Sequence, residues 1–236
     1  MPNGRIAILF DIDGTLITSG GAGTRAWALA FEKAHGKEVD IGEFSDVGMT
    51  DAEVGKLSFE ATFGRNPTQD EIEKLLELHQ SFLPIAVEES QGYKVLDGAE
   101  DLLSKLILDG YLLGLVSGNT EKGAHIKLHR ANLNRFFSFG GYGSDSTDRS
   151  ELTNAALSRA ELTYGARIQL SQFLSVGDTP RDIDQLTRSG FSVLEWRAIS
   201  FQLPSSQVRE QIMLSVRFGK DCRSREWKRF MSFQKI

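Results

Sequence analysis

Four short apolar runs, separated by stretches with helical periodicity, constrain the fold of this chain more than any other feature. The runs span residues 6–10, 112–117, 136–140 and 173–177. Between them, apolar residues recur at three- and four-residue spacings over residues 100–108, 121–133 and 150–164. Short buried strands that alternate with amphipathic helices are typical of βαβ units, in which the helices cross over a parallel sheet. The sequence therefore predicts an α/β fold with an open parallel sheet.

The block from residue 17 to residue 89 does not follow this alternation. It contains three helical patterns, at 24–34, 51–63 and 68–87, and no clear strand. Thr68 and Glu71 have the spacing of a capping box, which favours a helix start at this point. We interpret the block as a helical module of residues 17–89 inserted into an α/β core of residues 1–16 and 90–194.

Polar residues follow each of the four apolar runs. In open α/β sheets the ligand site lies beyond the carboxyl ends of the strands, so these residues are expected to converge. One such set is an ordinary turn, but sets at four successive strand ends indicate a shared site. The residues are Asp11 and Asp13 after the first run, Ser117, Gly118 and Asn119 at the second, Asp148 and Arg149 after the third, and Asp178 and Asp182 after the fourth.

The pair Asp11 and Asp13 places two carboxylates where a buried strand ends. Alternation along a strand puts residues i and i+2 on one face, so the two carboxylates can share a site while Ile12 points into the core. At a separation of roughly 4 Å and an effective dielectric near 20, their repulsion costs about 4 kcal/mol. A cation or a proton between them would offset this cost, which indicates a metal-assisted or acid–base function.

The four sets, taken in order, resemble the motifs of the haloacid dehalogenase-like superfamily, in its phosphatase branch with a helical cap. The resemblance covers roughly residues 6–194 and extends to the phosphoglycolate phosphatases. It implies a Rossmann-like, doubly wound core with the 17–89 block as the cap. It also implies that Asp11 is the nucleophile and Asp13 the general acid and base of phosphoryl transfer.

The resemblance further implies a Mg²⁺ ion held by Asp11, the backbone carbonyl of Asp13, and Asp178. Asp182, the second acidic residue of the last motif, is then expected to act through water or outside the direct ligands. Ser117, Gly118 and Asn119 would bind the phosphoryl oxygens. These assignments agree with elementary chemistry, because a carboxylate approaches a dianionic phosphate only when a cation neutralises both.

The third motif departs from the family pattern. The family usually has a lysine there, often followed by proline, whereas this chain has Arg149 followed by Ser150. An arginine can supply the charge and a bidentate contact, so Arg149 is expected to bind phosphate. Lys122 and Arg181 are the alternative cations.

The cap loop Gly48-Met49-Thr50-Asp51 joins two predicted cap helices and presents mixed polar and apolar groups. Caps of this type close over the site and contact the leaving group of the substrate. We therefore expect Thr50 and Asp51 to determine substrate specificity, with closure of the cap excluding bulk water.

Residues 195–236 do not continue the core pattern. From residue 207 onward the chain has eight Lys or Arg and three Asp or Glu, a local charge of +5 in a protein of net charge −5. One interpretation is a native basic extension that contacts an anionic partner. The other, which we favour, is a frameshift, because codons compatible with Gln207 to Met213 can spell a family-like segment when shifted by one base. The nucleotide sequence decides between them.

Composition narrows the function further. The net charge of −5 argues against a nucleic-acid-binding protein, and no apolar run reaches the eighteen or so residues that span a bilayer. We expect a cytoplasmic Mg²⁺-dependent phosphatase that acts on a small phosphorylated metabolite. A phosphomutase of the β-phosphoglucomutase type needs the same four motifs and is the alternative. A catalytically impaired binding or regulatory protein is the alternative of another class.

Overall fold

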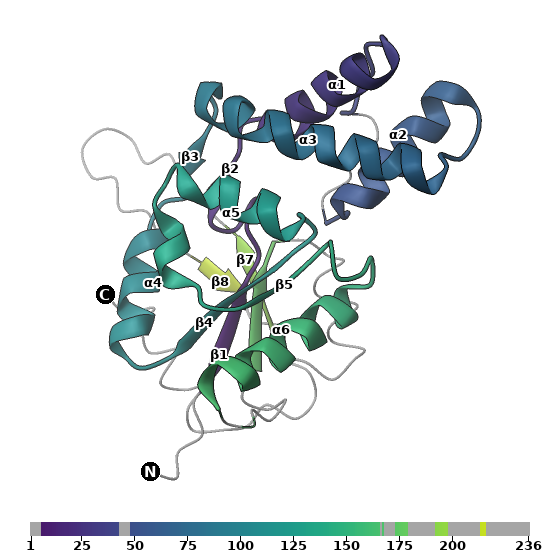
Figure 1. The fold of residues 1–236 in the computed structure, drawn as a ribbon. Helices are drawn as coiled ribbons and strands as arrows, with labels where there is room; N and C mark the ends of the chain where they lie inside the picture. Colours follow the sequence, from purple (N-terminus) through teal and green to yellow (C-terminus); the bar gives the residue numbers. More distant parts are fainter. Residues whose placement is uncertain are drawn as a thin grey trace.

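The computed structural model describes residues 6–42, 48–165, 167, 173–178, 192–197 and 213–215, the last two segments as backbone only. Its core is a six-stranded sheet with the order β5-β4-β1-β6-β7-β8 (Figure 1). Neighbouring strands are parallel except for β8, which runs antiparallel to β7. The strands are β1 (Ala7–Phe10), β4 (Leu112–Ser117), β5 (Gly140–Tyr142), β6 (Phe173–Gly177), β7 (Ser192–Arg197) and β8 (Met213–Ser215). The predicted α/β class is confirmed.

Helices cover both faces of the sheet, as the crossover pattern predicts. Alternate residues of β1 explain the two layers, since Ile8 and Phe10 belong to one apolar cluster and Ala7 and Leu9 to the other. The first cluster includes residues of α4 (Ala99–Leu108), of α5 (Glu121–His129) and of the 3₁₀ helix Leu133–Phe136. The second includes residues of α6 (Arg149–Tyr164). Every residue of β1, β4, β5 and β6 is buried, which is typical of a sheet covered on both sides.

The predicted strand at 136–140 is wrong. Residues Leu133–Phe136 form a 3₁₀ helix, and the strand begins later, at Gly140. Glycines are poor strand formers, but Gly141 has a packing reason here. A Cβ on Gly141 would lie 1.8 Å from the carbonyl oxygen of Leu152 in α6. The close approach of α6 therefore determines where β5 lies, which a propensity argument misses.

The cap consists of three helices beyond the carboxyl ends of the core strands (Figure 1). They are α1 (Ala22–His35), α2 (Asp51–Phe63) and α3 (Gln69–Glu89). Trp27, Phe31, Phe59 and Leu75 are buried in its apolar centre. None of the helices in the described ranges is both long and apolar enough to span a bilayer.

A short antiparallel ribbon joins the cap to the core. It pairs β2 (Ile17–Thr18) with β3 (Lys94–Val95), so the insert begins with a strand that is too short for sequence periodicity to detect. The two chain crossings are packed together, because a Cβ on Gly20 would lie 2.3 Å from the backbone of Gly92. The Ser90 hydroxyl donates to the carbonyls of Ser19 at 2.9 Å and Gly20 at 3.1 Å. These contacts tie both crossings to one another.

The predicted capping box at Thr68 and Glu71 is present at the start of α3. Arg65 donates two hydrogen bonds to Glu71, and together with bonds from Thr68 they lower the pKa of Glu71 to about 2. Because this pKa lies below its ordinary value of 4.5, the stabilisation is complete above pH 4.5 and is lost as the pH falls toward 2.

We expect the melting temperature of Glu71→Gln, measured by circular dichroism, to fall less between pH 5 and pH 3 than that of the wild type, because the variant has no carboxylate at this position to protonate. Glu77→Gln, at an exposed position on the same helix, is the matched control and should follow the wild type.

Candidate active site

The turn after β1 holds Asp11 and Asp13 toward one pocket and buries Ile12 between them. The amide of Asp11 donates to the carbonyl of Val176 in β6 at 2.9 Å, which continues the sheet pairing by one residue. Ile12 is fully buried, and its carbonyl accepts hydrogen bonds from the amides of Leu16 and Ile17. The expected alternation is therefore present, and both carboxylates line the pocket.

Arg149, at the start of α6, forms an ion pair with Asp11. Its guanidinium lies 3.1 Å from Asp11 Oδ1, and both side chains are buried, with 5% and 9% exposed. Arg149 is the first residue of α6, and Asp148 caps this helix by accepting from the amide of Ser150 at 2.7 Å. Capping of α6 thus fixes the backbone from which the arginine extends.

Of the alternative cations, Lys122 is exposed on α5 and does not line this pocket among the described residues. Arg181 lies outside the described residues, as does Asp182. The structure therefore places Arg149, and not Lys122, beside the candidate nucleophile.

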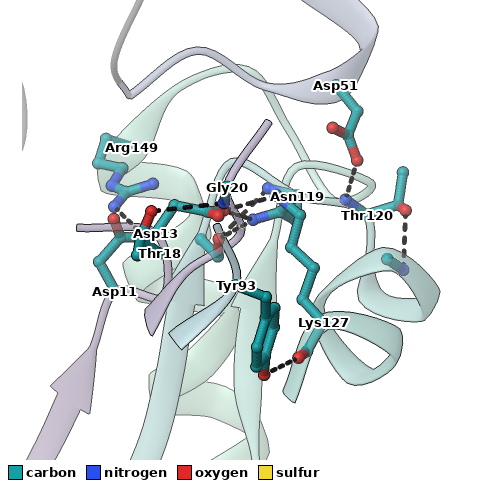
Figure 2. A network of polar contacts seen from close by, with 12 residues as sticks. Asp11, Asp13, Thr18, Gly20, Asp51, Tyr93, Asn119, Thr120, Lys127 and Arg149 are labelled. Atoms are coloured by element: carbon teal, nitrogen blue, oxygen red, sulfur yellow. Dashed lines mark hydrogen bonds and ion pairs between the residues drawn. The ribbon is translucent and has the colours of Figure 1, made fainter. Parts of the chain in front are cut away.

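Asp13 has a cation of its own, Lys127, which the sequence reasoning missed. Lys127 Nζ lies 2.6 Å from Asp13 Oδ2, and only 8% of the lysine side chain is exposed (Figure 2). Desolvation raises the pKa of Asp13, but the charge of Lys127 and hydrogen bonds from Lys127 and Asn119 outweigh it and hold the pKa below its ordinary value. In the sequence, Lys127 lies on the same face of the predicted helix as the apolar residues Ala124 and Leu128, which are buried. A charged residue at such a position could have indicated a buried partner.

The end of β4 is tied to the end of β1 through Asn119. Its side-chain amide donates to Asp13 Oδ2 at 3.0 Å and to the hydroxyl oxygen of Ser117 at 2.8 Å. Ser117 also accepts from the backbone amide of Asn119 at 3.3 Å, and both side chains are buried. The predicted residues Ser117, Gly118 and Asn119 therefore line the same pocket as the two aspartates.

Asp178, directly after β6, lies against the turn that carries Asp13. A Cβ on Gly14 would stand 2.2 Å from Asp178 Oδ2, and the backbone of Gly14 has φ +82°, so only glycine fits there. The Thr15 hydroxyl donates to Asp178 Oδ1 at 3.3 Å. Since β1 and β6 are adjacent and parallel, Asp11 and Asp178 follow neighbouring strand ends.

These residues fit a Mg²⁺ ion in the chemistry of their donors. Carboxylate and carbonyl oxygens are the ligands Mg²⁺ prefers, and it usually takes only one or two protein carboxylates and keeps several waters. In the described ranges no three His, Cys, Asp or Glu side chains form a metal-binding group. The expected set of two carboxylates, from Asp11 and Asp178, and the carbonyl of Asp13 does not require three.

The cap loop docks on the end of β4. The amide of Asp51 donates to the carbonyl of Gly118 at 2.9 Å, and Asp51 Oδ2 accepts from the amide of Thr120 at 2.7 Å (Figure 2). Asp51 lines the pocket, and its role in substrate specificity stays a prediction. Thr50 has a different place, because its buried side chain forms a capping box with Glu53 at the start of α2 and does not line the pocket.

Gly118 allows this docking, since a Cβ there would stand 2.2 Å from the carbonyl oxygen of Met49. We expect Gly118→Ala to displace the cap loop and to lower kcat/KM by about tenfold or more, because a misplaced binding group near the reacting atoms costs rate. Steady-state kinetics with a small phosphomonoester measures this. Gly64→Ala is the control, because Gly64 has φ +67° and no atom near its Cβ position. It should lose about 1 kcal/mol of stability and keep its kcat/KM.

The resulting pocket lies between cap and core and has a volume of about 290 Å³. Its core side supplies the carboxylates and the two cations described above. Its cap side supplies small, hydroxyl and apolar residues, namely Ser19, Gly21, Gly23, Thr24, Trp27, Ile41, Gly48, Met49 and Val54, with the carboxylate of Asp51.

Solved structures with this fold come from several bacteria. CbbY from Rhodobacter sphaeroides, in complex with phosphate, has a TM-score of 0.65 at 16% identity, over 80% of this chain and 84% of that one. A protein described as a predicted phosphoglycolate phosphatase from Haemophilus somnus 129pt has a TM-score of 0.59 at 18% identity, over 82% and 85%. A hydrolase from Pseudomonas syringae has a TM-score of 0.57 at 24% identity, over 79% and 82%. These likenesses confirm the fold.

No protein with a curated description matches the chain in sequence. The family model of the haloacid dehalogenase-like hydrolases, however, matches residues 7–190, well over half of the chain. The match ends at residue 190, four residues before Leu194, after which the core pattern was expected to stop. The chain therefore belongs to the haloacid dehalogenase-like hydrolase family.

Proposed function

We propose that this protein is a Mg²⁺-dependent phosphatase that hydrolyses small phosphorylated metabolites through an aspartyl-phosphate. Membership of the hydrolase family supports hydrolysis of a phosphoric monoester. The observation that carries the proposal is the pair Asp11 and Asp13 in one pocket, each beside its own buried cation. This arrangement gives two carboxylates separate partners, and hence separate roles.

In the first step, Asp11 attacks the phosphorus atom. An oxygen–phosphorus bond forms to the carboxylate while the bond to the leaving oxygen breaks, and Asp13, which must be protonated for this step, gives its proton to that oxygen. In the second step, Asp13 takes a proton from a water molecule that attacks the phosphorus, and phosphate leaves as Asp11 is regenerated. The covalent route replaces one difficult displacement with two easier ones. Proton transfer of this kind contributes about 10² to 10⁴ in rate.

The other residues of the pocket bind and orient the phosphoryl group. Ser117, the nearby backbone amides and Arg149 supply donors for its oxygens, in a site that the docked cap screens from bulk water. Asp11, the carbonyl of Asp13 and Asp178 would hold Mg²⁺, which when bound neutralises charge on the phosphate and on the carboxylates.

Release of phosphate from para-nitrophenyl phosphate tests the proposal. We expect activity with Mg²⁺, its loss on chelation with EDTA, and its recovery when Mg²⁺ is added back. Ca²⁺ should not restore it, because the larger ion takes more ligands at longer distances. A folded protein that binds phosphate but releases none from any phosphomonoester would instead be a binding or regulatory protein.

A further inference from the structure

The residues that line the pocket restrict which leaving group can bind there. We propose that the substrate is the phosphomonoester of a small uncharged alcohol, and that phosphorylated carboxylic acids are disfavoured. This inference rests on the proposed phosphatase function and adds the chemical class of the alcohol.

Both cations among the described residues that line the pocket are already engaged by aspartates. Lys127 is held by Asp13 at 2.6 Å and Arg149 by Asp11 at 3.1 Å. Among the described residues that line the pocket, these are the only Lys, Arg or His side chains. Since the remaining donors of Arg149 are assigned to the phosphoryl oxygens, a substrate carboxylate would have to compete with a catalytic aspartate or with the phosphoryl group for a cation, which weakens binding and disturbs the catalytic group.

The described walls of the pocket carry more negative than positive charge. Three carboxylates, those of Asp11, Asp13 and Asp51, face two cations, so the walls carry a net charge of −1. A bound Mg²⁺ and a dianionic phosphoryl group would cancel one another, and Asp178, which would help to hold the ion but does not line this pocket, adds one further negative charge. Any further negative charge on the leaving group therefore meets described walls of the same sign, which disfavours binding.

The cap side of the pocket, where the leaving group would lie, presents apolar and hydroxyl groups. Trp27, Ile41 and Val54 offer apolar contacts, and these cannot compensate the desolvation of a carboxylate. Ser19 and Thr24 offer hydroxyl groups suited to neutral hydrogen-bonding partners. Asp51 offers an acceptor, suited to a hydroxyl donor. The cap side thus matches an alcohol with an apolar carbon body.

The volume of the pocket limits the size of this alcohol. At about 290 Å³, the pocket is at the small end of the usual range for ligand sites, which is roughly 300–1,000 Å³. A phosphoryl group and a body of a few carbon atoms fill such a space.

Matched pairs of substrates test the inference. Glycerol 3-phosphate and 3-phosphoglycerate differ only in a hydroxymethyl group against a carboxylate, as do 2-hydroxyethyl phosphate and 2-phosphoglycolate. We expect kcat/KM to favour the neutral member of each pair by at least about tenfold. Asp51→Asn, which keeps the shape of the side chain and removes its charge, should narrow each ratio by about threefold or more. Asp70→Asn, an exposed first-turn aspartate of α3, is the matched control and should leave the ratios unchanged.

The outcomes separate the two levels of the proposal. Equal or better turnover of the acidic members would overturn the inference while the phosphatase function stands. Ratios that Asp51→Asn does not narrow would also count against it. If neither pair nor para-nitrophenyl phosphate is hydrolysed, the phosphatase proposal fails, and this inference fails with it.

Discussion

Asp11→Asn is expected to lower kcat for para-nitrophenyl phosphate by at least about a thousandfold, because a neutral amide is not a nucleophile toward phosphorus. The replacement is nearly isosteric, and the amide oxygen can still accept from Arg149. The folded state should therefore persist. Phosphate release under saturating substrate and Mg²⁺ measures the effect, with thermal unfolding as the check on folding.

Asp101→Asn is the matched control, since Asp101 is exposed on α4, away from the pocket. It should retain full activity. A covalent phosphoryl adduct on intact protein, detected by mass spectrometry after a rapid quench, should appear for the wild type and be absent for Asp11→Asn. If Asp11→Asn kept a tenth or more of the wild-type kcat, another nucleophile would have to be sought.

Lys127→Met is expected to produce the second large effect, because it leaves Asp13 without its cation. Removing one member of a fully buried pair costs about 3–5 kcal/mol. Because 37% of the Asp13 side chain is exposed, we expect a smaller loss of stability, about 1–3 kcal/mol. We also expect kcat to fall by about tenfold to a hundredfold, since the proposed acid–base carboxylate loses the contact that orients it.

The pH dependence of this variant has a defined sign. Lys127 lowers the pKa of Asp13 in the folded protein, so the ion pair stabilises the fold above pH 3.8, the ordinary pKa, and this stabilisation is lost as the pH falls through the lowered value. In Lys127→Met, the pKa of Asp13 should rise, which moves the acid limb of the activity profile to higher pH. Lys127→Arg should restore part of the activity. Lys122→Met, on the exposed side of the same helix, should behave as the wild type, and an unshifted acid limb in Lys127→Met would contradict the role of the pair.

The sequence predicts most of the core because its signals are local. The apolar run before Asp11 and the helical spacing before Tyr164 both come from burial patterns that a strand or helix must obey. The strand β5 was placed wrongly because Phe136 and Phe137 are apolar but only partly buried beside the first cluster. Its true position depends on contact between Gly141 and α6, which is a tertiary effect.

Some residues of the candidate site could likewise be predicted from local signals, and others depend on tertiary contacts. Asp11, Ser117 and Asp178 could be predicted because each directly follows or ends a strand, and Asp13 because it lies two residues after Asp11. Lys127 could not be found by that rule, because it reaches the pocket from the second turn of a helix and pairs with a residue 114 positions away in the sequence. Thr50 was predicted as a specificity residue because it lies in the right loop, but its side chain faces the start of its own helix.

The connection between cap and core has a mechanical consequence. The two crossings at Gly20 and Gly92 are locked together by backbone contact and by the Ser90 hydroxyl, so they offer a single pivot. Opening for product release should then be a rigid-body rotation of the three cap helices, which separates the loop before α2 from Gly118 and Thr120. The strength of the hydrogen bond between the Thr120 amide and Asp51 should therefore also influence the rate of product release.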